Sequence, residues 1–332
     1  MAIATTRTRG IVGLIGAIIL LFGSVAVFAT VAGFFGSTWW LFDLASDYRF
    51  PLMLTLVGVA IAYGFGYGRG AAVIFLGAAV VNAVLIVPLW IAQQPKAATG
   101  NSIRVVTFDV EGDDENRAEI FAWLDSVDAD IVFLQGTDAG WTAAVAATGT
   151  PYRVLAGPPG EDPGTTILAH PAVSVTAVPV TAVSVTAGEP HTEIVTELDG
   201  ATLTLIGVDA EIPASSDEAD ARLEYFAAIA ARAAEVETRV AVVGNLSTTR
   251  WSHAFRVLAG DLPLRSSEDG NGYSATWSIY PTFGATAAQH FLGLPIDHVL
   301  MSEDLTATAH TVGPDLGPNH RGVVVDLARA GA

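Results

Sequence analysis

The sequence has no cysteine and a single lysine, Lys96, among its 332 residues. The absence of cysteine excludes disulfide bonds and thiolate metal sites. Because no lysine follows Lys96 and the arginines do not cluster, the sequence lacks the basic patch that nucleic-acid binding requires. We therefore expect no nucleic-acid partner.

Charge and hydropathy are distributed unevenly along the chain. The sequence is 51% hydrophobic with a mean hydropathy of +0.47, yet its net charge is −18. The first hundred residues hold five basic and two acidic residues, which leaves 11 basic and 32 acidic residues, a net of −21, for the rest. A single soluble domain seldom combines such values, so we expect an apolar N-terminal part and a separate acidic domain.

Three uncharged runs cover most of the N-terminal part, at residues 11–36, 51–68 and 70–93. About 20 apolar residues suffice to cross a bilayer as a helix. The first run is too long for a cleavable signal peptide, and two more runs follow it at once. The sequence therefore predicts a membrane domain of three transmembrane helices within residues 1–95. Asn82, inside the third run, is expected to bond a neighbouring helix, with a functional polar site as the alternative.

Flanking arginines indicate the orientation. Arg7 and Arg9 precede the first run, and Arg69 lies between the second and third. Positive residues near helix ends favour the cytoplasmic side. We therefore expect the acidic domain to lie outside the plasma membrane.

A polar segment with proline and glycine, residues 96–102, predicts a linker to a globular domain over residues 103–330. Helical spacing of apolar residues favours helices at 115–127 and 217–236. Apolar runs rich in valine predict strands at 103–110, 130–135, 165–170, 173–185, 193–198, 202–208, 240–244, 296–301 and 322–327. Strands with helices between them indicate an α/β domain with a buried sheet.

Several short motifs lie at strand ends or in loops of this pattern. They are Trp39-Trp40, Arg49-Phe50-Pro51, Gly244-Asn245-Leu246-Ser247, Ile296-Asp297-His298-Val299 and Pro318-Asn319-His320. With the order of strands, they resemble the endonuclease/exonuclease/phosphatase superfamily, in particular bacterial members with three N-terminal transmembrane helices. The resemblance implies a DNase I-like four-layer α/β sandwich. It also implies hydrolysis of phosphodiesters or phosphomonoesters, usually with Mg²⁺.

The same resemblance places the metal site at the ends of the first two strands. Asp109 stands where the family has a metal-site asparagine, and Gly136 stands where the family has its principal metal carboxylate, a glutamate. Asp138 lies two residues further on. If a cation binds, we expect Asp109 and Asp138 to hold it.

The other family positions are also substituted. Asp209 resembles a family histidine, Asn245 an aspartate that orients the nucleophile, Ser247 a phosphate-binding asparagine, and Asn319 an aspartate. Asp297 and His320 match the family and predict a vestigial hydrogen-bonded pair. We interpret the acidic stretch over residues 111–115 as a solvated loop.

These substitutions lead to two hypotheses. In the first, the domain is a pseudoenzyme without a cofactor and acts as a scaffold or binding component of the cell envelope, with an envelope protein or lipid as partner. In the alternative, a site rebuilt from Asp109, Asp138, Asp209 and His320 makes the protein a divalent-metal-dependent phosphodiesterase or phosphatase that acts on an envelope substrate.

Overall fold

The computed structural model describes residues 2–92, 98–112, 115–158, 164–177, 191–260, 264–278, 292–316 and 319–331. These ranges fall into two compact units, Met1–Pro88 with Trp251–His253, and Leu89–Arg250 with Ala254–Ala332. Parts of the predicted linker at 96–102 and of the predicted strand at 173–185 lie outside the described residues.

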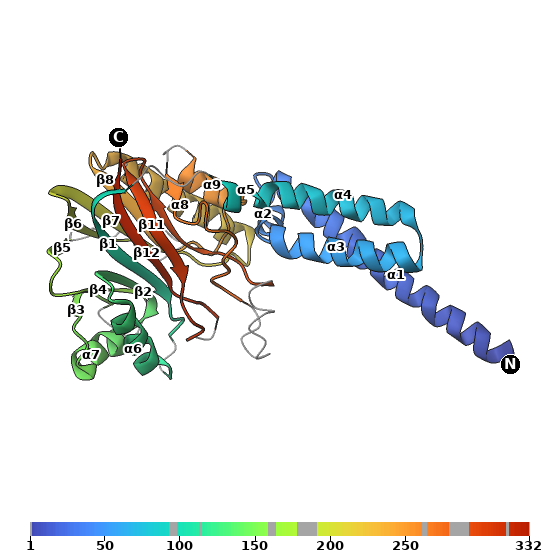
Figure 1. Ribbon diagram of the computed structural model, residues 1–332, viewed down its shortest axis with the longest axis horizontal. Coiled ribbons are helices and arrows are strands. Elements are labelled where there is room, and N and C mark those ends of the chain that lie inside the picture. Colours follow the sequence, from blue (N-terminus) through green and yellow to red (C-terminus); the bar gives the residue numbers. More distant parts are fainter. Residues whose placement is uncertain are drawn as a thin grey trace. The chain divides into compact units, whose positions relative to one another are not determined.

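The N-terminal unit is helical (Figure 1). Its elements are α1 (Ala2–Ala32), η1 (Gly33–Phe35), α2 (Trp40–Asp47), α3 (Arg49–Gly66) and α4 (Arg69–Ile86), after which comes the short α5 (Pro88–Ile91). Within the described residues, three stretches are long and apolar enough to cross a membrane: Ile11–Phe35, Arg49–Gly66 and Arg69–Ile91. The predicted three-helix region is confirmed, and α2 lies in the connection for which no helix was predicted.

Close packing and buried polar contacts hold these helices together. A Cβ at Gly23 would lie 2.5 Å from the ring of Phe75, so glycine there lets α4 approach α1 closely. Asn82 of α4 donates through Nδ2 to Thr30 Oγ1 of α1 at 2.8 Å. Arg49 at the start of α3 donates to the Thr30 carbonyl at 2.7 Å. Asn82 therefore bonds a neighbouring helix, as predicted.

The described strands of the second unit form two six-stranded sheets. The first sheet has the order β11-β12-β1-β2-β4-β3 and comprises β1 (Ala98–Asp109), β2 (Ile131–Thr137), β3 (Arg153–Ala156), β4 (Gly164–Ala169), β11 (Leu305–Val312) and β12 (Val323–Ala330). The second has the order β5-β6-β7-β8-β10-β9 and comprises β5 (Val175–Ala177), β6 (Thr192–Leu198), β7 (Ala201–Asp209), β8 (Arg239–Asn245), β9 (Arg265–Ser266) and β10 (Asp297–Met301). Both sheets mix parallel and antiparallel pairs, because β1 runs parallel to β2 and β7 parallel to β8.

The strand β1 begins earlier than predicted, since residues from Ala98 onward pair with the end of β12. The described part of the predicted linker therefore belongs to the sheet. Its polar residues suggested a linker because they lie at the exposed end of the strand, where neither face is covered.

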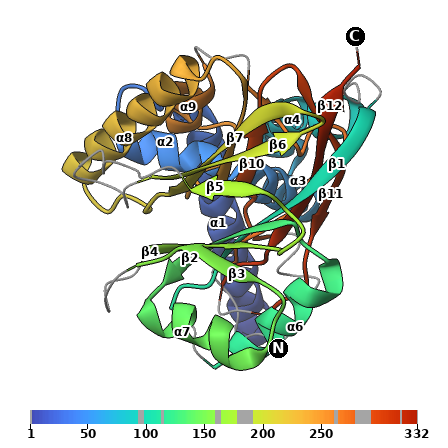
Figure 2. The ribbon, with the colours of Figure 1, turned by 90° about the vertical axis from the view of Figure 1, so that its left-hand side faces the viewer.

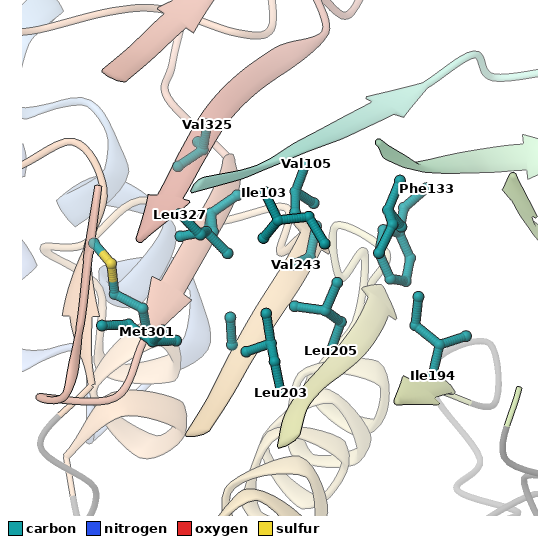
Figure 3. Close-up of a cluster of buried hydrophobic side chains, with 14 of the residues drawn as sticks. Ile103, Val105, Phe133, Ile194, Leu203, Leu205, Val243, Met301, Val325 and Leu327 are labelled. Atoms are coloured by element: carbon teal, nitrogen blue, oxygen red, sulfur yellow. The ribbon is translucent and has the colours of Figure 1, made fainter. Parts of the chain in front are cut away.

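The core lies between the two sheets, where side chains from both interdigitate (Figure 3). Ile103 and Val105 of β1 point into this core, whereas Val106 and Phe108 point to the opposite face. That opposite face is covered by α6 (Arg117–Val127) and α7 (Ala139–Thr148), and α8 (Ser216–Glu235) and α9 (His253–Ala259) cover the other sheet (Figure 2). The described elements thus form the predicted four-layer sandwich, and burial of both strand faces explains the continuous apolar runs.

Strand register brings polar residues together at one end of the sandwich. Asp109 is paired with Gln135, the position before Gly136. In the second sheet, Asn245 lies between Asp209 on one side and Asp297 on the other. The candidate site forms at these strand ends.

Candidate active site

A pocket of about 440 Å³ opens at these strand ends. It is lined by Asp109, Glu111, Gly112, Gly136, Asp209, Ala210, Glu211, Ile212, Asn245, Ser247, Trp277 and His320. The pocket therefore gathers most of the residues that the sequence singled out. Their chemical roles stay predictions.

The predicted Asp297–His320 pair is formed. His320 Nδ1 lies 3.0 Å from Asp297 Oδ2 and 3.2 Å from Oδ1, with both residues buried. On the pocket side, His320 Nε2 lies 3.5 Å from Glu111 Oε1 and 3.8 Å from Asp109 Oδ2. Burial opposes a charge on this ring, but the Asp297, Glu111 and Asp109 carboxylates outweigh it and raise the pKa of His320 well above its usual value. His320 is thus an imidazolium surrounded by carboxylates.

Asp109 is fixed by two N–H donors. Its Oδ1 accepts from the backbone nitrogen of Glu111 at 2.9 Å, and its Oδ2 accepts from Asn245 Nδ2 at 2.8 Å. Burial raises the pKa of Asp109, an effect that the nearby charge of His320 opposes. Asn245 in turn accepts from the backbone nitrogen of Ser247 at 2.7 Å, so one chain of hydrogen bonds links the ends of β1 and β8.

Glu111 is one of the pocket residues that the sequence did not predict to lie there. Its Oε2 accepts from Asn319 Nδ2 at 2.7 Å. The hydrogen bond to His320 lowers the pKa of Glu111 despite partial burial. Glu111 lies in an exposed turn, in line with the interpretation of residues 111–115 as a solvated loop, and it also lines the pocket; residues 113 and 114 lie outside the described residues. In the sequence, the indication that Glu111 lies near the pocket is its place two residues after Asp109. In the structure the chain leaves β1 and turns there, with a positive φ of 44° at Glu111.

Gly136 has no room for a side chain. Its φ is +67°, and a Cβ built on it would lie 2.9 Å from both Asp109 Oδ1 and the backbone nitrogen of Glu111. A Cβ at this position would therefore crowd the start of the loop after β1, and its positive φ favours glycine. Position 136 thus carries no carboxylate where the resemblance places one.

Asp138, the candidate replacement for that carboxylate, caps the start of a helix. Its Oδ1 accepts from the backbone nitrogens of Gly140 at 2.8 Å and Trp141 at 3.2 Å, which makes it the N-cap of α7. Asp138 is not among the residues that line the pocket. The structure thus gives Asp138 a capping role outside the pocket, and its role as a metal ligand stays a prediction. Asp209, by contrast, lies in the pocket wall at the end of β7.

Comparison with known sequences identifies the family. The sequence model of the Endonuclease/Exonuclease/phosphatase family matches residues 106–323. The chain belongs to this family. No curated protein matches the chain in sequence.

Solved structures agree in fold. Truncated Caenorhabditis elegans TDP2 aligns with a TM-score of 0.54 at 15% identity, covering 68% of this chain and 97% of that one. The endonuclease/exonuclease/phosphatase from Bacteroides vulgatus aligns with a TM-score of 0.51 at 13% identity, covering 69% of this chain and 99% of that one. An AP endonuclease from Archaeoglobus fulgidus aligns with a TM-score of 0.50 at 13% identity, covering 67% of this chain and 98% of that one. Identities this low show a shared fold alone.

The described pocket carboxylates are not arranged as a site for the divalent cation that this family usually uses. Within the described ranges, no group of three or more His, Asp or Glu side chains is placed to hold a metal ion. Both oxygens of Asp109 accept from N–H groups, and the Glu111 carboxylate lies between Asn319 and His320. A hard cation needs anionic oxygens that are free to turn toward it. These oxygens are turned toward nitrogen donors instead.

Proposed function

We propose that the protein is a membrane-anchored, catalytically degenerate member of the endonuclease/exonuclease/phosphatase family that works as a scaffold or binding component of the cell envelope. The observation that carries this proposal is the environment of Gly136, where an added Cβ would lie 2.9 Å from the backbone nitrogen of Glu111. Where the resemblance places the family glutamate, this chain has no carboxylate, and a side chain could enter only if neighbouring atoms shifted.

Charge supports the same proposal. A phosphoester is an anion, and the family chemistry requires a cation to offset its charge. Here Asp109, Glu111, Asp209 and Glu211 line the pocket around one imidazolium, that of His320. Without a bound cation these carboxylates repel a phosphate.

The partner we propose is an envelope protein or a lipid. Three helices long and apolar enough to span a membrane would hold the domain at its surface. With a net charge of −21 after residue 100, the acidic domain disfavours nucleic acid as a ligand. We further propose that the domain lies outside the plasma membrane.

The alternative remains a hydrolase with a rebuilt site, and one observation favours it. Asp109, Asp209 and His320 share the pocket, and Glu111 adds a carboxylate that could stand in for Asp138. Such an enzyme would require Asp109 and Glu111 to release their nitrogen donors when a cation binds.

An activity assay separates the two. Full-length protein in detergent is incubated with generic phosphodiesters and phosphomonoesters in the presence of Mg²⁺, Mn²⁺ or Ca²⁺, beside His320→Ala. We expect no metal-dependent turnover in either protein. Turnover in the wild type that His320→Ala abolishes would establish the hydrolase and refute the scaffold.

A further inference from the structure

A second pair of titratable side chains lies outside the pocket, in the interior of the domain. Glu268 is in the turn after β9, and His298 follows Asp297 on β10. The two are 2% and 1% exposed. Glu268 Oε2 and His298 Nδ1 face each other at 3.8 Å, and neither atom has a hydrogen-bond partner among the described residues.

The other ring nitrogen of His298 defines its tautomer. His298 Nε2 lies 2.9 Å from the carbonyl oxygen of Thr248. A carbonyl can only accept, so Nε2 carries a proton. The neutral ring then presents the lone pair of Nδ1 to Glu268, and an ionised Glu268 would bring a negative oxygen against it. Two facing acceptors in a dry interior are unfavourable, whereas a proton on Glu268 makes them complementary.

The surroundings favour this neutral arrangement. Burial raises the pKa of Glu268 to about 8, although the charge of Arg250 opposes the rise. Burial likewise lowers the pKa of His298 to about 4. Arg250 is already paired with Asp269 at 2.6 Å, and Asp297 is paired with His320.

One further histidine lies nearby on β11. His310 Nδ1 is 2.9 Å from Ser267 Oγ, and burial lowers the pKa of His310 to about 4. His310 is thus also neutral near pH 7, and it supplies no charge to offset an ionised Glu268.

We propose that Glu268 and His298 form a neutral buried pair with the proton on Glu268, and that His298 fastens the loop after β8 through Thr248, so that ionisation of Glu268 loosens this loop. The loop matters because Thr248 directly follows Ser247, and Ser247 lines the pocket with Asn245. The pair would make this wall of the pocket sensitive to alkaline pH. The inference holds whether the pocket binds or hydrolyses its ligand.

The direction in which stability changes with pH follows from the raised pKa of Glu268. The pKa of Glu268 is higher in the folded protein, at about 8, than its ordinary value of 4.5. Its contribution to stability is therefore fully present below pH 4.5 and is lost as pH rises toward 8. His298 contributes with the opposite sign between about pH 4 and its ordinary pKa of 6.5. A variant that keeps His298 but cannot ionise at position 268 isolates the effect of Glu268.

The experiment compares wild type, Glu268→Gln and Glu197→Gln as full-length proteins in detergent. The amide of Glu268→Gln can donate to His298 without ever ionising, and Glu197 is an exposed glutamate on β6. As pH rises from about 5 to about 8, we expect the Tm of Glu268→Gln to increase by a few degrees relative to the Tm of wild type. The Tm difference between Glu197→Gln and wild type should stay constant over the same range. Hydrogen exchange in residues 246–252 should be faster in wild type than in Glu268→Gln at about pH 8.5, and equal at about pH 6.

The tautomer gives a test on the wild type alone, which decides the matter even if Glu268→Gln fails to fold. Long-range ¹H–¹⁵N spectra of the histidine rings, assigned with His298→Gln, should show a neutral His298 protonated at Nε2 from about pH 5 to pH 7.5. A doubly protonated His298 in that range, or a Tm difference between wild type and Glu268→Gln that is independent of pH, would overturn the proposal.

Discussion

A Cβ atom on Gly136 would lie 2.9 Å from the backbone nitrogen of Glu111. Gly136 stands where the family resemblance places a metal-binding glutamate, and Glu111 belongs to the loop that follows β1. A side chain at position 136 would therefore have to displace this loop or the Asp109 carboxylate.

This relationship predicts the effect of substituting Gly136. We expect Gly136→Ala to lower the free energy of unfolding by about 1–3 kcal/mol, since it combines a left-handed backbone with a close backbone contact. Gly136→Glu should be at least as destabilising and should gain no metal affinity. Denaturant unfolding in detergent measures the first effect, and calorimetry with Mn²⁺ the second.

Gly149 supplies the matched control. Its φ is +71°, close to that of Gly136, but a Cβ there would meet nothing within 4 Å. Gly149→Ala should therefore lower the free energy of unfolding by about 1 kcal/mol, the cost of a left-handed backbone conformation alone. Equal losses in Gly136→Ala and Gly149→Ala would show that the contact with Glu111 is not restrictive.

The Asp297–His320 pair predicts a second result. Because its pKa is raised in the folded protein, His320 contributes stability that is full below pH 6.5 and is lost as pH rises through the raised value. We expect Asp297→Asn to lower the pKa of His320. It should also lower the free energy of unfolding by roughly 3 kcal/mol near pH 6, since one partner of a buried pair is removed. The difference from wild type should shrink at higher pH. An NMR titration of His320 and unfolding at two pH values test this, and an unchanged pKa would contradict it.

The helical unit predicts a third result. The hydrogen bond from Asn82 to Thr30 joins α4 to α1, and Asn82 is fully buried within this unit. Asn82→Leu should destabilise the unit by about 1 kcal/mol in detergent unfolding. Val84, on the same helix, is 65% exposed, so Val84→Leu should have almost no effect. Similar losses for both variants would argue against a specific role of the Asn82 bond.

Orientation in the membrane gives a fourth prediction. Arg7, Arg9 and Arg69 favour a cytoplasmic N-terminus and a cytoplasmic connection between the second and third spans. Protease added to cells stripped of their outer layers should then digest the acidic domain, while a cytoplasmic control protein stays intact. Protection of the acidic domain until the membrane is permeabilised would reverse the orientation.

The sequence predicted the fold well where the pattern was long and regular. The three apolar runs and the strands at 193–198 and 202–208 were predicted close to their observed bounds, since hydrophobic periodicity depends little on distant residues. α7 was missed, because an alanine-rich segment after Asp138 gave no amphipathic pattern. Family motifs placed Asp297 and His320 together across a separation in sequence that no local pattern could bridge.

The pocket itself was predictable only in part. Substitution at Gly136 was visible in the sequence, but the loop that fills its space depends on the left-handed conformation of Glu111 and on a hydrogen bond from Asn319. Both are tertiary features. For Asp138 the sequence suggested a metal ligand, whereas the structure shows this carboxylate bonded to the first backbone nitrogens of α7, a role that depends on a helix the sequence pattern did not indicate.

The most direct test of the central claim is a Mn²⁺ titration of the full-length protein followed by electron paramagnetic resonance, beside Asp109→Asn. We expect wild type and Asp109→Asn to leave the same amount of Mn²⁺ free in solution, because the carboxylates of Asp109 and Glu111 accept from nitrogen donors. Stoichiometric Mn²⁺ binding by the wild type that Asp109→Asn abolishes would contradict the account and establish a metal centre in the pocket.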